Sequence, residues 1–416
     1  MLVYFEQYDK AMMAKSRHIG FSKLWALFLF TATALATTAQ NPNTPPGMER
    51  DMMPMLRVSV QNGNILVNKT PYLEAPDGLG HYLKATKAFS LEYGWQTYGG
   101  EVWQQACKFP NLGVGLQYMR IMGRNDLGHP ISLYGFYNGN YFWSKNFQFT
   151  NRIGTGLTVG LATFDPRDSV PNYVISSKVN AFVELGMGVA IRISDHFYME
   201  PGLRFTHFSN GNMKRPQRGI NVASYSIGFH GVMGQVPHEP IKMPLPKPAH
   251  EQEIIAYIGL GSRQIEFGKD SSDLYADTHG FNYLMANLHI GYYYGLTRRF
   301  KLGGGLDLIY DGTNGQQELA GESIVQKTNV PLEDKLGLAI FVGGETSIYK
   351  LSVLGSFGYM LAEKRFEKST PLFEQRLGLK YHFYKNMFIG TTLRAYRFRA
   401  AKAIEFNIGT RMNIGK

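Results

Sequence analysis

The segment from Leu203 to Phe229 contains the residue types that acyl transfer to a side chain requires. Within it, His207 and Ser209 stand two positions apart, and side chains two positions apart on a β-strand point to the same face. A serine hydroxyl becomes a strong nucleophile when a neighbouring imidazole takes its proton and a third group fixes the imidazole tautomer. The pair therefore predicts attack on an ester, with Ser209 as the nucleophile and His207 as the base.

Two expected strands, near 197–209 and 220–233, bring a third residue to this pair. In the first strand, His207 shares an apolar face with Phe205, and in the second strand Asn221 also shares its face with apolar residues. If the two strands form a hairpin, the apolar faces lie on the same side of the sheet. We therefore expect the histidine, the serine and Asn221 to meet on one face.

The composition of the whole chain indicates which kind of fold positions these residues. Of 416 residues, 44% are hydrophobic and only 18% are charged, and there are 25 Tyr, 27 Phe and 46 Gly. Abundant aromatic residues exclude a disordered chain, and a single cysteine excludes a disulfide framework or a cysteine-based zinc site. Low charge with many Gly, Tyr and Phe is typical of an all-β barrel whose outer face contacts lipid.

Residues 1–39 are predicted to be a secretory signal peptide. Basic residues precede the apolar run Leu24–Ala36, and small residues follow it, which is the order of the three regions of such a peptide. The run is too short for a membrane-spanning helix, which needs about 20 residues. Because the sequence contains no longer apolar stretch, we expect the mature chain to enter a membrane as a closed antiparallel barrel.

Strand-like runs separated by turn residues fall into two groups of eight, at 55–234 and 251–416, with a proline-rich linker at 235–250. Bacterial membrane barrels have an even number of strands. An alignment at an offset of 190 residues matches the sixth and seventh runs of the two groups, a weak internal duplication. We expect two eight-stranded barrels in tandem, with a single sixteen-stranded barrel as the alternative.

The expected runs have the following bounds. The first group lies near 56–67, 86–97, 112–121, 130–140, 146–163, 174–192, 197–209 and 220–233. The second group lies near 253–267, 280–295, 299–310, 335–346, 348–361, 372–384, 386–398 and 402–414.

The expected direction of the strands places the histidine and serine near the outer surface of the membrane. If the barrel begins in the periplasm, odd-numbered strands run outward, and the strand near 197–209 ends at the cell exterior. The loop that follows contains Lys214, Arg215 and Arg218, which we expect to bind anionic headgroups of the substrate. Polar side chains that face lipid are costly and indicate function, so the predicted substrate is an ester within the outer leaflet.

Here the sequence resembles a known family. His-Phe-Ser-Asn at 207–210, followed by Lys-x-Pro-x-x-Gly at 214–219 before a final strand, resembles the PagL-type lipid A 3-O-deacylases, also described as acyloxyacyl hydrolases. The resemblance covers roughly residues 56–234. It implies an eight-stranded outer-membrane barrel of a Gram-negative bacterium that removes an ester-linked hydroxyacyl chain from lipid A of lipopolysaccharide, without a cofactor or a metal.

The resemblance also implies roles for individual residues. His207 corresponds to the base and Ser209 to the nucleophile, and Asn210 is a candidate for stabilising the oxyanion. The family has an acidic residue fourteen positions after the histidine, but here that position is Asn221. An amide oxygen can fix the tautomer of a histidine, although it cannot stabilise an imidazolium by charge. Glu184 is an alternative carboxylate, but alternation places it inside the barrel.

The second half lacks these residues and is expected to be non-catalytic. At the offset of 190, the three positions correspond to Arg397, Arg399 and Arg411. We expect this half to support contact with lipopolysaccharide through basic residues such as Arg394, in keeping with the formal net charge of +11. Nucleic acid is not an expected partner, because no recognition element is present. The alternative function is a non-catalytic barrel with a structural, transport or lipid-binding role.

Overall fold

The computed structural model describes most of the chain after residue 51. The described residues are 52–66, 85–122, 127–144, 146–165, 167–168, 172–236, 240–241, 243–245, 250–265, 267–269, 282–320, 323–327, 329–364, 372–397 and 400–414. The expected signal peptide at 1–39 lies outside these ranges. Among the described residues, no helix is both long enough and apolar enough to cross a membrane.

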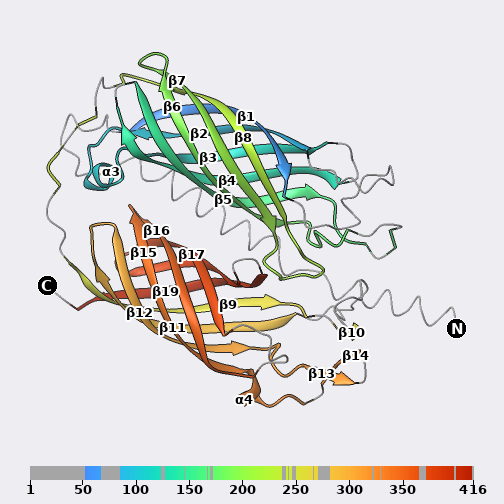
Figure 1. The fold of residues 1–416 in the computed structure, drawn as a ribbon. Coiled ribbons are helices and arrows are strands. Elements are labelled where there is room, and N and C mark those ends of the chain that lie inside the picture. Colours follow the sequence, from blue (N-terminus) through green and yellow to red (C-terminus); the bar gives the residue numbers. More distant parts are fainter. Residues whose placement is uncertain are drawn as a thin grey trace. The chain divides into compact units, whose positions relative to one another are not determined.

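The first eight long strands form a closed antiparallel barrel (Figure 1). Each strand pairs with the next one, and the last strand, β8, pairs with β1. A short helix, α3 (Val102–Ala106), lies between β2 and β3. The strands are β1 (Met52–Ile65), β2 (Ala85–Thr97), β3 (Asn111–Ile121), β4 (Gly128–Trp143), β5 (Phe147–Leu161), β6 (Asn180–Arg192), β7 (Phe197–Ser209) and β8 (Ile220–Val232).

A second closed antiparallel barrel follows, and β19 pairs with β9 to close it. Its strands are β9 (Gln252–Arg263), β11 (Tyr283–Gly295), β12 (Phe300–Asp311), β15 (Leu336–Ile348), β16 (Leu351–Glu363), β17 (Phe373–Tyr384), β18 (Met387–Tyr396) and β19 (Ala400–Asn413). A small sheet of β10 (Gly268–Lys269), β14 (Ser323–Gln326) and β13 (Gln317–Ala320) and a short helix, α4 (Leu332–Lys335), lie in its connections. The prediction of two eight-stranded barrels is confirmed, and the sixteen-stranded alternative is wrong.

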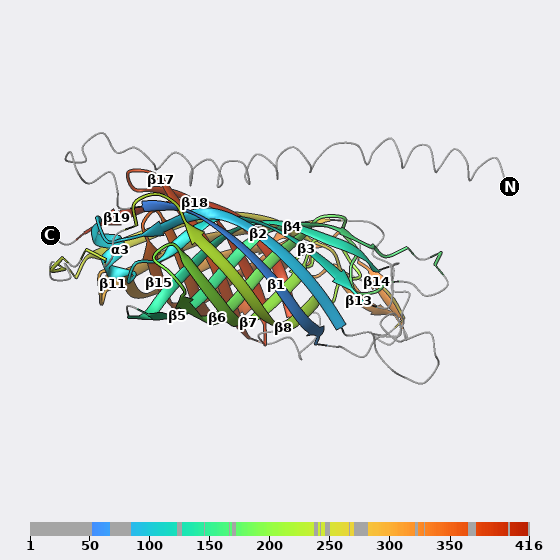
Figure 2. The same ribbon diagram turned by 90° about the horizontal axis from the view of Figure 1, so that it is seen from above.

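The strands form where side chains alternate between an apolar outer face and a polar inner face. In β2, for example, Leu91 and Tyr93 are exposed, whereas Ser90 and Glu92 are buried. Figure 2 shows strands β5 to β8 running diagonally and side by side. Tilt of this kind is required when a sheet closes into a barrel, and it fixes a small interior that side chains fill.

Most strand boundaries agree with the sequence-based expectation within a few residues, but β6 begins at Asn180 rather than at 174. The residues at 174–179 belong to the preceding loop. There the side chain of Asn172 accepts the backbone N–H of Val174 and of Ile175 at 2.9 and 3.2 Å. The carbonyl of Val174 in turn accepts the backbone N–H of Gly219 at 3.1 Å. These hydrogen bonds hold residues 174–179 at the end of the barrel. The segment therefore does not join the β-ladder.

The interior of the first barrel contains buried ion pairs. Arg152 pairs with Glu184 through Nε at 2.5 Å and also with Glu92. Arg57 pairs with Glu92 at 2.8 Å and with Glu200 at 2.6 Å. Charges that are removed from water persist only when they are paired and hydrogen-bonded. The lumen is therefore filled by a connected polar network, and the predicted inward position of Glu184 is confirmed.

The second barrel has a comparable interior, and this corrects one expectation. Arg394 is fully buried, and its guanidinium pairs with Glu374 at 2.7 Å and with Glu405 at 3.0 Å. It therefore has no access to a lipid headgroup, and its expected role in lipopolysaccharide contact is wrong. The physical reason is its place on the inward face of β18. Arg397 lies in the turn after β18, and Arg399 lies outside the described residues.

We predict that Arg152→Met destabilises the first barrel by about 3–5 kcal/mol, the usual cost of leaving a buried partner charge uncompensated. Equilibrium unfolding by urea in detergent micelles or lipid vesicles measures this change. The control is Arg120→Met, because Arg120 is exposed on β3 of the same barrel. Equal losses for the two variants would contradict the structural role of the buried network.

Candidate active site

Strands β7 and β8, adjacent in Figure 1, position the predicted residues on the outer face of the first barrel. His207 stands directly opposite Asn221 in the β7–β8 ladder, and such cross-strand neighbours lie about 5 Å apart at Cβ. Ser209 follows two positions along β7 and points to the same side. All three side chains are half-buried, whereas neighbours on the same face, such as Leu203 and Tyr225, are exposed.

The three side chains form a continuous chain of hydrogen bonds. Nδ1 of His207 lies 2.6 Å from Oδ1 of Asn221, and Nε2 of His207 lies 2.9 Å from Oγ of Ser209. Because an amide oxygen only accepts, Nδ1 carries the imidazole proton and Nε2 has a free lone pair. The serine hydroxyl therefore donates to Nε2. This is the protonation pattern in which an imidazole can remove the proton of a nucleophilic serine.

Neither Glu184, the alternative considered from the sequence, nor Glu200 on β7 substitutes for Asn221. Glu184 is buried in the barrel interior, where it pairs with Arg152. Glu200 is also inside, paired with Arg57 and within 3.1 Å of His230. The hydrogen-bond partners of the His207 imidazole are thus an amide and a hydroxyl.

The structure places Asn210 away from Ser209, on the opposite face of the chain. Its Nδ2 donates to Oγ of Ser176 at 3.0 Å and to the carbonyl of Lys214 at 2.8 Å. Its Oδ1 accepts the backbone N–H of Asn212 at 2.9 Å. The side chain is fully engaged in shaping the loop at 210–219. The expected role of its amide in stabilising an oxyanion is therefore corrected to a role in loop structure.

Two other loop residues were missed as site residues from the sequence. Gly219 has φ of +72°, and a Cβ atom there would lie 3.1 Å from Cε1 of His207 and 3.3 Å from Cβ of Ser209. Only the absence of a side chain lets the backbone approach the pair so closely. Gln217, two residues earlier, has both side-chain amide atoms buried without a hydrogen-bond partner among the described residues. The Lys-x-Pro-x-x-Gly spacing was the available indication of this close approach.

The basic residues of the loop differ in their surroundings. Lys214 and Arg218 are exposed. Arg215 is half-buried, and its Nε donates to Oδ1 of Asn212 at 2.9 Å. The loop thus presents at least two cations to solvent, and holds a third against the side chain of Asn212.

Comparison with known families now identifies the chain. The family model described as "Lipid A 3-O-deacylase (PagL)" matches residues 87–230, which include all three hydrogen-bonded residues. The model described as "Acyloxyacyl hydrolase, C-terminal domain" matches residues 251–414. The first barrel belongs to the PagL-type lipid A 3-O-deacylases. The first barrel contains the matched deacylase segment of this lipid A deacylase family, and the second barrel is the C-terminal domain.

One curated relative agrees with the PagL assignment. Lipid A deacylase PagL of Bordetella bronchiseptica is 24% identical over 166 residues, which cover 36% of this chain and 79% of that protein. A porin of Rh. blastica covers 87% of the chain at 8% identity and a TM-score of 0.16. The Pseudomonas putida toluene transporter TodX covers 91% at 11% identity and the same TM-score. These TM-scores are too low to indicate a shared overall arrangement.

We predict that Gly219→Ala lowers the reactivity of Ser209 towards a fluorophosphonate ester at least about tenfold, because small displacements of reacting groups are costly. The new Cβ would lie 3.0 Å from the carbonyl oxygen of Phe208 as well as against His207. The rate of covalent labelling of the folded protein measures the effect.

The matched control is Gly234→Ala. Gly234 also has a positive φ, of +92°, but the nearest atom to an added Cβ is Sδ of Met53 at 3.6 Å. Both variants suffer the strain of a left-handed conformation, about 1–2 kcal/mol. Equal labelling of the two variants would show that the close approach of Gly219 to the pair has no chemical importance.

Proposed function

We propose that this protein is an outer-membrane serine esterase that hydrolyses the 3-O-linked hydroxyacyl ester of lipid A. The observation that supports this most directly is the chain of hydrogen bonds from Ser209 through His207 to Asn221, on the outer face of a barrel. Its place within the segment that matches a lipid A deacylase family gives the substrate class.

The proposed reaction has two steps. In the first, Nε2 of His207 takes the hydroxyl proton while Oγ of Ser209 attacks the ester carbonyl. The tetrahedral intermediate then collapses, the sugar oxygen leaves with the proton from the imidazolium, and the acyl group remains on the serine. In the second step, a water molecule gives its proton to His207 and attacks the acyl-serine. The fatty acid leaves, and the proton returns to Oγ.

The position of the site agrees with a substrate in the outer leaflet. Ser209 ends β7, at the barrel end where the longer connections 66–84, 162–179 and 210–219 lie. The other end has the short turns 144–146 and 193–196, together with the connection 98–110 that contains α3. Outer-membrane barrels have short periplasmic turns and longer extracellular loops. The acyl chain of a lipid would therefore lie along the exposed apolar face, with its ester beside Ser209.

The exposed cations of the adjoining loop suit the proposed substrate. Lys214 and Arg218 are on the loop that covers the histidine and serine, where the phosphate groups of lipid A would lie. Gln217 is proposed as the donor to the oxyanion, because its amide is buried beside Gly219 without a partner among the described residues. A preorganised donor in a site shielded from water stabilises the charge that develops on the carbonyl oxygen.

We predict that Ser209→Ala abolishes deacylation, because no other atom can form the acyl intermediate. The measurement is mass spectrometry of lipid A from a Gram-negative host that produces the full chain. The wild type should remove one hydroxyacyl chain, and Ser209→Ala should leave lipid A unchanged. The control is Ser224→Ala, because Ser224 lies on β8 but faces the interior, where it donates to Gln61 at 3.1 Å.

Two outcomes would contradict the proposal. Unchanged lipid A with folded wild-type protein would favour a non-catalytic lipid-binding barrel, the alternative that Asn221 itself supports. Full activity of Ser209→Ala would exclude the serine mechanism. A difference in migration between unheated and heated samples in a detergent gel shows that each variant is folded.

We predict that Asn221→Glu raises the deacylation rate at least about tenfold, because a carboxylate stabilises the imidazolium that forms in the transition state. Asn221→Asp is a companion variant that leaves the side-chain length unchanged, so that the 2.6 Å contact with Nδ1 is retained. Initial rates on purified lipid A in mixed micelles measure the effect. Asn221→Leu, which removes the acceptor, should be slower than the wild type. If all three variants are equally slow, charge at this position does not limit the rate.

A further inference from the structure

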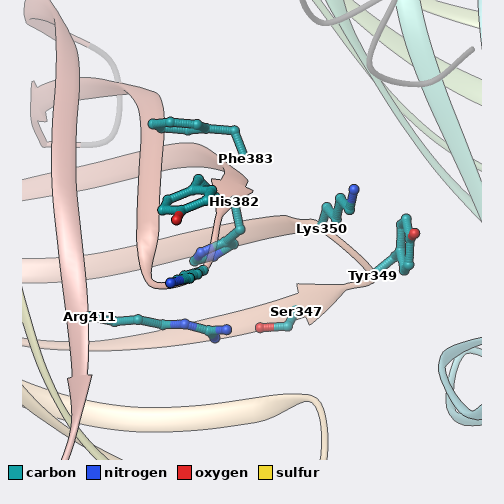
Figure 3. Close-up of a pocket in the computed structure, with 8 residues that line it drawn as sticks. Ser347, Tyr349, Lys350, His382, Phe383 and Arg411 are labelled. Atoms are coloured by element: carbon teal, nitrogen blue, oxygen red, sulfur yellow. The ribbon is translucent and has the colours of Figure 1, made fainter. Parts of the chain in front are cut away.

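The mouth of the second barrel contains a recess of about 370 Å³ that the proposed deacylation does not use. Ser347, His382 and Arg411 line it, from the ends of β15, β17 and β19 (Figure 3). The turns β15–β16 and β17–β18 complete its rim and contribute Lys350 and Lys385. The recess thus lies at the barrel end with the short turns.

The side chains of His382 and Arg411, at the bottom of the recess, point into the lumen. Along β17, the inward positions include buried Arg376 and Lys380, and His382 continues this series. Arg411 likewise follows buried Asn407 on β19 at the inward spacing of two. In Figure 3, the guanidinium of Arg411 and the hydroxyl of Ser347 point toward one another, with His382 beside them.

Two nitrogen atoms of these side chains have no hydrogen-bond partner among the described residues. They are Nδ1 of His382 and Nε of Arg411. Nε2 of His382 lies 3.2 Å from Oγ of Ser352, so the serine can donate to Nε2 and leave a proton on Nδ1. Buried donors without an acceptor are costly, and both would be satisfied by an acceptor in the recess.

The carboxylates beneath the recess offset only the cations of the lumen, and Lys301 also has Glu251 as a partner at 3.5 Å. Glu345 pairs with Lys380 at 2.7 Å, and Glu253 pairs with Lys301 at 2.6 Å and lies 3.8 Å from Arg411. Glu345 is therefore paired with a buried lysine, and Glu253 is shared between Lys301 and Arg411.

On the rim, Lys350 and Lys385 have no carboxylate partner within the described part of the chain. Their amino groups lie 5.6 and 5.2 Å from the ring centres of the neighbouring Tyr349 and Tyr384. The recess consequently has an excess of positive charge.

We propose that this recess binds a small soluble anion of the phosphate type. Arg411 and Nδ1–H of His382 donate to its oxygen atoms from the lumen side, and the two rim lysines provide the remaining charge. An arginine fork suits a phosphate group because it can donate two parallel hydrogen bonds. The two tyrosines on the rim can contact a sugar or glycerol moiety attached to the phosphate.

A soluble ligand fits better than a lipid headgroup, because His382 and Arg411 belong to the inner face of the barrel. Lipid contacts the outer face of a barrel, and the lumen opens to water. The recess lies at the end of the second barrel where its short turns are. Because outer-membrane barrels have short turns on the periplasmic side, this mouth would face the periplasm. The ligand would then be a phosphate ester of that compartment rather than lipid A in the outer leaflet.

The test is calorimetric titration of the full chain in detergent micelles with inorganic phosphate and with glycerol 3-phosphate, at constant ionic strength. We expect saturable binding to one site, and Arg411→Gln should weaken it at least about tenfold, as expected for the loss of a charged hydrogen bond. The double variant Lys350→Gln, Lys385→Gln should also weaken binding and reduce its salt dependence. It changes only rim residues and keeps the test valid if Arg411→Gln does not fold.

The matched control is Lys364→Gln. Lys364 follows β16 at the opposite end of the same barrel, where it pairs with Asp334 at 3.3 Å, and its substitution should leave binding unchanged. Absence of phosphate binding overturns the proposal, as does equal binding by Arg411→Gln. Binding of phosphatidylglycerol vesicles without binding of free phosphate overturns it too, because the source would then be a lipid. Lipid A deacylation is measured separately, so the two proposals fail independently.

Discussion

Closure of the backbone hydrogen-bond ladder is the constraint on which both barrels depend. Every long strand pairs with two neighbours, and β8 and β19 return to β1 and β9. A closed ladder leaves no edge unpaired, and it forces successive side chains alternately outward and inward. The same constraint places His207 opposite Asn221 and brings Ser209 to the same side. The site is thus held in place by main-chain pairing between neighbouring strands.

The alternation of side chains along each strand also separates the polar residues of the first barrel into an inward set and an outward set. The carboxylates Glu92, Glu184 and Glu200 are inside the first barrel, where arginines compensate them. None is left to orient the outward histidine. The outer face therefore relies on the amide of Asn221, which fixes a tautomer without burying a charge near lipid. This arrangement explains how a polar trio can be tolerated on a face of otherwise exposed apolar side chains.

The two barrels share an architecture but differ in where their polar residues gather. In the first, the hydrogen-bonded trio lies on the outer face at the end with the long connections. In the second, the cationic recess lies on the inner face at the end with short turns. An alignment of the two halves pairs Asn221 with Arg411, and both are functional candidates, yet on opposite faces. A common fold thus supports separate chemistry at separate surfaces.

Alternation of residue types along the sequence determined the barrel fold, the strand boundaries within a few residues and the shared face of the trio, because a period of two follows directly from strand geometry. The resemblance to the deacylase family implied in addition that Asn221 stands where that family has an acidic residue. Only the tertiary structure separated two barrels from one, because closure depends on which distant strands pair. Likewise, only the folded loop engaged Asn210 elsewhere, brought Gly219 against His207 and began β6 at Asn180, since these contacts join segments that local sequence does not relate. The inward burial of Arg394 and the recess around Arg411 were equally decided by three-dimensional packing.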